Sequence, residues 1–283
     1  MAEYFTARGM PVPRELTRGP LSDWRRNVTV ILTIAVLAIG FKILDIDLSR
    51  SNPSYMGQVL LQLVQFDWSV MTPQNEFETF WDTAGGLMIV TIFLGIMGTA
   101  FALIVAVPMS FLGARNIMAG NPITNGIYVA VRLLFTIIRS IDVLIVVLIV
   151  LPLFGLGNAS GVFALAFHNV GVMGKLYSEA IEGIDAGPAE AMTATGANRF
   201  QVIWAAIVPQ LVNPFISFTI YRLDTNVRLA NVIGLVGGGG IGVALFQNIQ
   251  LLRYHTAGTF ILLIIITVAA MDFISAQVRK RLV

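Results

Sequence analysis

The chain has 283 residues, of which 56% are hydrophobic and 12% are charged, and its mean hydropathy is +0.80. An ordinary soluble domain is about 25% charged, so this composition is that of a membrane protein. The net charge of +2 is too small for a nucleic-acid-binding surface, and no nucleic acid partner is expected. The absence of cysteine excludes disulfides and thiolate chemistry, and the two histidines, His168 and His255, lie far apart in the sequence. Neither a metal nor another cofactor is therefore expected.

Long apolar runs predict an all-α membrane protein, because a spanning helix needs about 20 predominantly apolar residues. Six spans are predicted, at residues 27–45, 84–113, 124–156, 160–181, 207–235 and 257–277. The first follows Arg25 and Arg26 and is expected to be an uncleaved signal anchor. Residues 56–64 place apolar side chains on one helical face and glutamines on the other. This pattern predicts a helix that lies at the outer membrane interface.

The distribution of lysine and arginine predicts that both termini are cytoplasmic. With that topology, ten basic residues fall in the inner segments and three fall in the outer segments. The inner set is Arg8, Arg14, Arg18, Arg25, Arg26, Arg115, Arg199, Arg279, Lys280 and Arg281, and the outer set is Lys42, Arg50 and Arg253. Because inner loops of membrane proteins carry the excess of basic residues, this orientation is favoured over its inverse.

Residues 182–210 form the longest predicted cytoplasmic segment. Their sequence pattern predicts two short helices joined by a turn. Pro188 suits the first turn of a helix, and Gly196 permits the left-handed turn that would end it. Pro209 marks the point where the chain is expected to re-enter the membrane. From spacing alone, the segment is either a knob on which a partner docks or an ordinary connector.

Charged residues also occur inside the predicted spans. A charge at mid-membrane costs roughly 2.5 to 3.5 kcal/mol on insertion scales, so such residues must face protein or water. Asp224 and Arg228 are four residues apart and suit an ion pair within one helix, whereas Arg222 has no acid on its own helical face. Two interpretations remain open, helix-packing ion pairs and a positively charged pathway for a small oxyanion. The pathway candidates are Arg139, His168, Lys175, Arg222, Asp224 and Arg228.

Gly237, Gly239 and Gly242 match the pattern G-x-G-x-x-G. The dinucleotide-binding fingerprint needs a strand before it and a helix after it in a βαβ unit, whereas these glycines follow a predicted membrane span on its outer side. A phosphate-binding G-x-x-x-x-G-K-[ST] loop is absent from the sequence. No nucleotide site is predicted, so any ATP hydrolysis must occur on a partner.

The cytoplasmic segment resembles the EAA signature of permease subunits of bacterial binding-protein-dependent ABC importers. That pattern is E-A-A-x-x-x-G, nine residues, then I-x-L-P. The matching residues are Glu190, Ala191, Gly196 and Pro209, and the departures are other apolar residues. Segments 96–116, 168–185 and 221–242 look most like the phosphonate-type branch. The resemblance begins near residue 84 and continues to the C-terminus.

The resemblance implies a type I importer permease core in residues 84–283. Residues 1–83 carry no such motif, and there hydropathy alone predicts a cytoplasmic tail, an extra N-terminal helix and the interfacial segment. The resemblance also implies a multi-pass protein of the bacterial inner membrane without catalytic residues. Two ATP-binding subunits would dock on segment 182–210, a second permease subunit would complete the pathway, and an extracytoplasmic binding protein would deliver phosphonate, phosphate or phosphite. The glycines 237–240 and Gly242 would form an outer gate loop.

Two other function classes remain as alternatives. An ion-coupled secondary transporter or channel would use the same buried charges as an ion relay. A membrane-embedded enzyme is less favoured, because no paired catalytic acids or metal ligands converge in the sequence.

Overall fold

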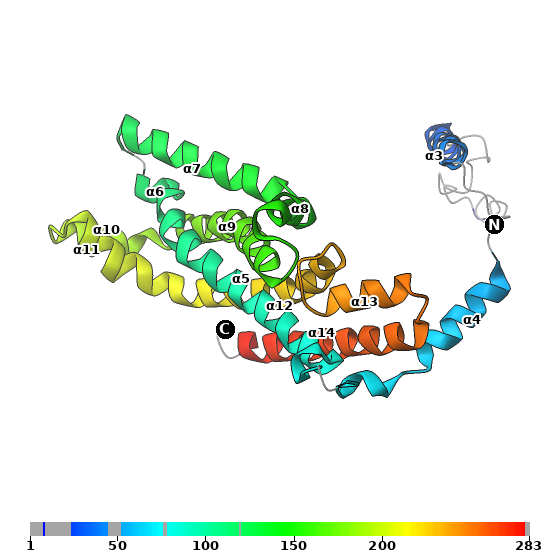
Figure 1. Ribbon diagram of the computed structural model, residues 1–283. Coiled ribbons are helices and arrows are strands. Elements are labelled where there is room, and N and C mark those ends of the chain that lie inside the picture. Colours follow the sequence, from blue (N-terminus) through cyan, green and yellow to red (C-terminus); the bar gives the residue numbers. More distant parts are fainter. Residues whose placement is uncertain (1–7, 9–23, 45–51, 76–77, 119, 281–283) are drawn as a thin grey trace. The chain divides into compact units, whose positions relative to one another are not determined.

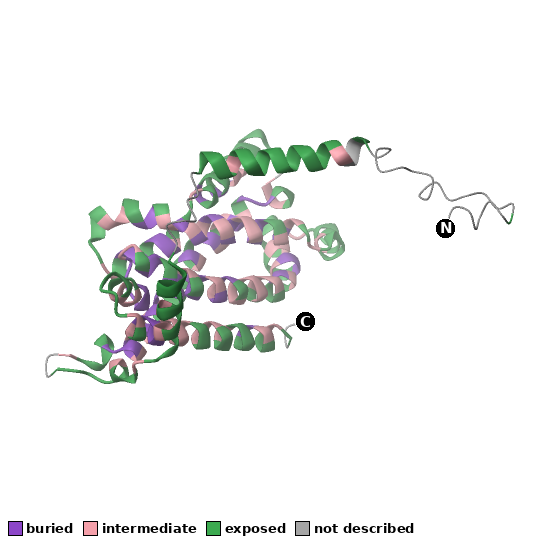
Figure 2. Ribbon diagram, turned by 90° about the vertical axis from the view of Figure 1, so that its right-hand side faces the viewer, coloured by how far each residue is buried: buried purple, intermediate pink, exposed green. Residues whose placement is uncertain are grey.

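The computed structural model describes residues 8, 24–44, 52–75, 78–118 and 120–280. Of the basic residues that predict the topology, Arg14, Arg18, Arg50 and Arg281 lie outside the described residues. The chain divides into two compact units, Met1–Gly57 and Gln58–Val283. The first unit contains helix α3 (Trp24–Ile43) and the beginning of α4 (Pro53–Val64). The apolar side chains described in α3 are exposed, as suits a helix surrounded by lipid (Figure 2).

All regular secondary structure in the described part of the second unit is helical (Figure 1). Its elements are η2 (Trp68–Met71), η3 (Phe80–Asp82), α5 (Ala84–Leu112), α6 (Arg115–Met118), α7 (Pro122–Ser140), α8 (Val143–Phe154), α9 (Asn158–Glu182), α10 (Ala186–Ala194), α11 (Arg199–Val202), η4 (Ile203–Ile207), α12 (Val208–Leu235), α13 (Ile241–Gln250) and α14 (Tyr254–Lys280). The predicted all-α class is confirmed. Helix α4 also confirms the helix expected over residues 56–64.

Four helical stretches are long and apolar enough to cross a membrane: Ala84–Leu112, Pro122–Ser140, Arg199–Leu235 and Tyr254–Lys280. Asn27–Ile43 and Val143–Phe154 are shorter apolar helices. Helix α9 covers the predicted span 160–181 and has 25 residues. It is less apolar because its buried face carries polar side chains, among them Asn169 and Ser178, as helices that pack inside a membrane bundle often do.

The prediction of a single span over residues 124–156 is wrong. Helix α7 ends at Ser140 and a separate helix, α8, begins at Val143. Asp142 has an extended backbone and accepts a hydrogen bond from the N–H of Leu144 at 2.8 Å, so it is the N-cap of the new helix. An N-cap residue leaves the helical backbone conformation, and the chain changes direction there. Hydropathy does not detect this break because apolar residues flank it on both sides.

Pro209, the predicted point of membrane re-entry, lies within a continuous helical run. Helices α11 and α12 join through η4, a π turn in which the N–H of Val208 donates to the carbonyl of Ile203. Proline has no N–H to give, and the wider π turn accommodates this loss without ending the helix. The result is one continuous helical run of 37 residues, Arg199–Leu235.

The core of the second unit forms where α5, α9 and α12 pack along one another, and buried residues concentrate there (Figure 2). Small residues allow this close approach. A Cβ atom added to Gly98 on α5 would lie 2.6 Å from the Cβ of Leu165 on α9, and one added to Gly95 would lie 2.8 Å from Val227 on α12. Close backbone approach at small residues is the usual way in which membrane helices gain packing energy.

The segment between α4 and α5 is tied to the last helix. The N–H of Asp67 donates to the hydroxyl of Thr259 at 2.8 Å, and the hydroxyl of Thr256 donates to the Asp67 carboxylate at 3.2 Å. Hydrogen bonds from Ser69 hold the pKa of Asp67 below its ordinary value. This charged carboxylate therefore fixes η2 against the beginning of α14.

We expect Gly161→Ala to lower the stability of the protein, because the new Cβ would lie 2.1 Å from the carbonyl oxygen of Gly238. Overpacking of this kind costs about 1–3 kcal/mol when the backbone must shift. The matched control is Gly126→Ala on α7, where nothing lies within 4 Å of the added atom. Thermal unfolding of the detergent-purified protein should show a lower Tm for Gly161→Ala only. Equal Tm values for the two variants would contradict the packing at Gly161.

Candidate functional site

Residues 182–210 fold as the two short helices that the sequence predicts, with a glycine turn between them. Asp185 caps α10 by accepting from the N–H of Gly187 at 3.0 Å. At the other end, Gly196 has φ +83°, and the N–H of Ala197 donates to the carbonyl of Met192 at 3.3 Å. This is a Schellman ending, in which the residue after the helix must adopt a left-handed conformation. The predicted left-handed turn at Gly196 is confirmed.

The second helix begins with a reciprocal cap that the sequence analysis missed. The N–H of Gln201 donates to the side chain of Asn198 at 2.9 Å, and the N–H of Asn198 donates to the side chain of Gln201 at 2.8 Å. The signal was present in the sequence, because a capping residue followed three positions later by glutamine marks a helix start. This cap fixes the direction in which α11 leaves the turn.

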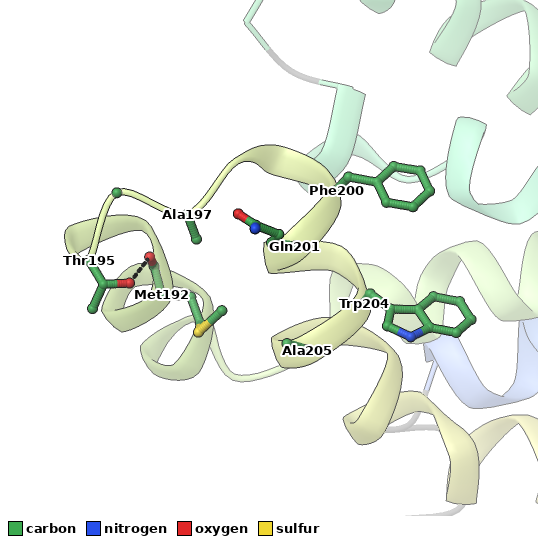
Figure 3. A pocket seen from close by; sticks show the side chains of 8 residues that line it. Met192, Thr195, Ala197, Phe200, Gln201, Trp204 and Ala205 are labelled. Atoms are coloured by element: carbon green, nitrogen blue, oxygen red, sulfur yellow. Dashed lines mark hydrogen bonds between the residues drawn. The ribbon is translucent and has the colours of Figure 1, made fainter.

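Together α10, the turn and α11 form an exposed knob at one end of the second unit (Figure 1). A pocket of about 890 Å³ lies between the two helices, and Met192 projects into it (Figure 3). Phe200 and Trp204 are 78% and 70% exposed, and their rings point to the same side of the helical run (Figure 3). Exposed aromatic side chains of this size are typical of a surface that another protein covers.

The residues of the predicted docking motif lie on or beside this knob. Glu190, Ala191 and Pro209 are exposed. Glu190 lines a second groove, of about 540 Å³, that also includes Asn116. The knob therefore presents a carboxylate, a low-profile alanine face and aromatic side chains to its surroundings.

Lys175 belongs to an ion-pair cluster at the same end of the molecule. Its ammonium lies 3.7 Å from Glu179, and the guanidinium of Arg132 on α7 lies 2.5 Å from Glu182. Arg132 also donates to the carbonyl of Gly113 at 2.9 Å, and Glu182 accepts from the N–H of Arg115 at 2.7 Å. The cluster joins the end of α5 to α7 and α9, so Lys175 has local acidic partners.

Arg222 is buried in the middle of α12 and has an unusual partner. Its side chain donates to the amide oxygen of Asn169 on α9 at 2.5 Å, and only 8% of the residue is exposed. Among the described residues, no carboxylate lies within ion-pair distance of this guanidinium. Within the described part of the chain, the Nε–H of Arg222 and the amide nitrogen of Asn169 have no hydrogen-bond partner. A positive charge with spare donors is therefore held among buried residues, which is costly unless an anion or water compensates it.

Asp224 and Arg228 form the ion pair that their spacing predicts, with 2.7 Å between Nη2 of Arg228 and Oδ2 of Asp224. Arg228 also donates to Asp272 on α14, a partner that the sequence analysis missed. The chain therefore compensates the Arg228 charge with two carboxylates. The sequence offered no signal for this second contact, since it depends on how α12 and α14 pack.

The two remaining pathway candidates are His168 and Arg139. His168 contacts the carbonyl of Ile141 through Nδ1 at 3.1 Å, next to the break between α7 and α8, and it lies close enough to Arg222 for the two charges to interact. Arg139 is exposed in the last turn of α7. Among the six candidates, Arg222 is the one held among buried residues without an acid.

The glycine loop between α12 and α13 is tightly packed at the end of α12 that lies away from the knob (Figure 1). Gly237, Gly239 and Gly240 have φ values of +94°, +90° and +71°, which favour glycine. A Cβ at Gly242 would lie 2.1 Å from the carbonyl oxygen of Asn231. The loop is anchored to α5, because the N–H of Ile241 donates to the hydroxyl of Thr91 at 2.8 Å.

Residues 116–283 match the family model of the binding-protein-dependent transport system inner membrane component. The chain belongs to this family. Relatives include the phosphate-import permease protein PhnE of Mycolicibacterium smegmatis, which is 38% identical over 197 residues. That alignment covers 69% of this chain but 36% of the mycobacterial protein, so the chain spans about a third of that relative. The phosphite transport system permease protein PtxC of Stutzerimonas stutzeri is 37% identical over 193 residues, which cover 68% of this chain and 69% of PtxC.

Solved structures of importer permeases share the fold. An inward-facing structure of the MetNI methionine ABC transporter aligns with a TM-score of 0.60 and 20% identity, covering 69% of this chain and 94% of that chain. A bacterial alginate ABC transporter aligns with a TM-score of 0.56 and 18% identity, covering 93% of this chain and 97% of that chain. The chain is thus an integral inner-membrane permease component with the type I importer fold. It is a transport subunit and not an enzyme.

We expect Glu182→Gln to destabilise the protein more than Glu179→Gln. Glu182 makes a close ion pair and accepts a backbone hydrogen bond, and hydrogen bonds to charged groups contribute about 1.5–3 kcal/mol each. Glu179 is 49% exposed and its ion pairs are 3.7 and 3.8 Å long, so its loss should cost at most about 1 kcal/mol. Thermal unfolding of both variants checks this order. A larger loss of Tm in Glu179→Gln would mean that Glu182 does not hold the cluster together.

Proposed function

We propose that the chain is the transmembrane subunit of an ATP-driven importer of a small oxyanion, namely phosphonate, phosphate or phosphite. A second permease subunit, identical or a paralogue, completes the translocation pathway. Two ATP-binding subunits dock on the cytoplasmic knobs, and an extracytoplasmic binding protein delivers the cargo. Family membership carries the transport role, and the names of the relatives PhnE and PtxC support an oxyanion of phosphorus as cargo.

The knob, which lies within segment 182–210, is the proposed contact with the ATP-binding subunits. It bears the motif residues Glu190 and Gly196 and exposes the aromatic rings of Phe200 and Trp204. Because α11 of the knob continues through η4 into α12, a displacement of the docked α11 is passed to a membrane helix. This is the structural requirement for alternating access driven by closure of the ATP-binding subunits.

The proposed topology has both termini in the cytoplasm, with the knob inside and the glycine loop, residues 237–242, outside. Residues 84–283 form the importer core in this proposal, and residues 1–83 form an accessory segment. The 37-residue run that connects knob and loop is about 55 Å long at 1.5 Å per residue, which exceeds the thickness of a bilayer. The glycine loop is the proposed outer gate.

Among the proposed pathway residues, Arg222 has the strongest physical case. Arg228 and Lys175 already have acidic partners, whereas the Arg222 guanidinium has an amide partner and a free Nε–H. An arginine keeps its proton in a desolvated setting, so Arg222 provides a fixed positive charge for an anion in transit. Conduction also requires that such a site bind the anion weakly enough to release it.

ATP dependence and cargo selection test the proposed function together. The permease is co-purified with its ATP-binding subunits, and ATPase activity is measured with binding protein loaded with phosphonate, phosphite, phosphate or an amino acid. We expect stimulation by the loaded protein with a phosphorus oxyanion and none with the amino acid. Uptake that persists without ATP, or that depends on an ion gradient, would instead support the ion-coupled alternative.

We expect Gly196→Ala to reduce ATP-driven uptake, because a side chain at φ +83° strains the turn by about 1–2 kcal/mol. Glu190→Ala should reduce uptake by removing a charged docking contact. Mutations along a coupling route change coupling by about 0.5–2 kcal/mol, which is roughly two- to thirtyfold in uptake. The matched control is Gly187→Ala on α10, where the added Cβ meets only ordinary contacts of 3.5 Å. Wild-type uptake in both test variants would refute the docking assignment.

We expect Arg222→Lys to transport better than Arg222→Gln, because lysine preserves the positive charge and glutamine removes it. A uniform loss of assembly and thermal stability in both variants would indicate a structural role instead. Uptake is therefore compared only for complexes that co-purify with their ATP-binding subunits in normal yield. The pathway role is refuted if an assembled Arg222→Gln complex imports its anion at the wild-type rate.

A further inference from the structure

Asp185, the N-cap residue of α10, is held to the membrane helix α12 by the side chain of Gln210. The Oε1 of Gln210 accepts from the N–H of Asp185 at 3.1 Å, and its Nε2 donates to the carbonyl of Asp185 at 3.3 Å. The same Nε2 donates to the carbonyl of Ala206 on its own helix at 2.8 Å. One side-chain amide thus pairs with both backbone groups of a residue 25 positions away, at the N-cap of α10.

Apart from this contact, α10 is lightly packed. The helix has nine residues, none of them buried, and it contacts α11 and η4. Ile184, just before the N-cap, packs against a small buried cluster of residues from α9, η4 and α12. Connectors at residues 183–185 and 195–198 join it to the rest of the chain, and Gly196 lies in the second of them. A short helix with so little apolar contact area can rotate about its connectors unless a directed contact prevents it. The pair of hydrogen bonds to Asp185 is such a contact, because two bonds to one residue fix direction as well as distance.

Gln210 also stands at a particular point of the membrane helix. It directly follows Pro209 and the π turn η4, where the regular hydrogen-bond ladder of the helix is interrupted. Its bond to Ala206 bridges this interrupted turn within the helix. The side chain therefore links α10, η4 and α12 across the place where the run of helix would bend most readily.

We infer that Gln210 is a positioning residue for energy coupling: it makes α10 and α12 move as one body when an ATP-binding subunit displaces the knob. This inference rests on the proposed importer function and adds a residue outside the docking motif. Without the Gln210 contact, α10 follows the ATP-binding subunit while α12 lags behind. ATP is then hydrolysed without a matching import of cargo.

The test is the number of cargo molecules imported per ATP hydrolysed by the complete importer in vesicles. Gln210→Leu removes all three hydrogen bonds, and Gln210→Glu keeps the acceptor for the Asp185 N–H but loses both donors. The control, Gln277→Leu, changes an exposed glutamine near the end of α14. We expect Gln210→Leu to lower the ratio by roughly three- to thirtyfold while ATPase activity and assembly stay near wild type. Gln210→Glu should lie between wild type and Gln210→Leu, and the control should match wild type.

A second measurement reports the position of α10 without relying on transport. The chain has no cysteine, so Ala194→Cys and Val232→Cys place two unique spin labels, one on α10 and one near the outer end of α12. In the assembled complex, Gln210→Leu should broaden the distance distribution between the labels. An unchanged distribution would mean that other contacts hold α10.

A wild-type import ratio in Gln210→Leu overturns the inference. If Gln210→Leu does not assemble, Gln210→Glu decides: a lowered ratio supports the inference, and a wild-type ratio overturns it. If neither variant assembles, the Gln210 contact is required for folding, and this result also overturns the inference. The proposed function is tested by separate experiments: Gly196→Ala tests the docking knob, and ATP withdrawal tests the energy source. Loss of uptake in Gly196→Ala with a normal ratio in Gln210→Leu would reject the Gln210 role alone.

Discussion

The structure depends on one constraint: inside a bilayer, polar groups must find their partners within the protein, because no water is available. Two arginines of α12 illustrate different solutions. Arg228 is neutralised by Asp224 and Asp272. Arg222 is bonded to an amide and keeps an unused donor. Arg228 already has carboxylate partners, so an anionic ligand would gain no binding energy there, whereas the Arg222 charge would be stabilised by an anion. The kind of partner thus separates charges that serve packing from charges proposed for the pathway.

Hydropathy and helix-capping rules predicted most of the helices because both depend on local sequence. The apolar runs placed α5, α12 and α14, and the turn at Gly196 followed from the conformational freedom of glycine. The break at Asp142 was missed, since one capping side chain ends a helix without altering the average hydropathy around it. The π turn before Pro209 was missed for a related reason: sequence rules treat proline as an end, while a widened turn absorbs it.

The candidate site divides in the same way into local and tertiary parts. The Asp224–Arg228 pair followed from a spacing of four residues. The contacts of Arg222 with Asn169, and of Gln210 with Asp185, join residues 53 and 25 positions apart. No spacing rule reaches across such separations, because these contacts depend on which faces of two helices meet. The sequence therefore identified Arg222 as a candidate, but neither its partner nor the contact of Gln210 could be found from the sequence.

The packing of the glycine loop bears on how the proposed gate can open. A loop that moved by itself would need room, yet Gly242 contacts the backbone of Asn231 and Gly238 contacts that of Gly161. The hydrogen bond from Ile241 to Thr91 adds a tie to α5. Because glycines let these backbones touch, displacing the loop alone would open a void and leave buried backbone groups without partners. Movement of α12 together with its loop avoids both penalties, so opening by rigid displacement of whole helices is favoured over opening of the loop by itself.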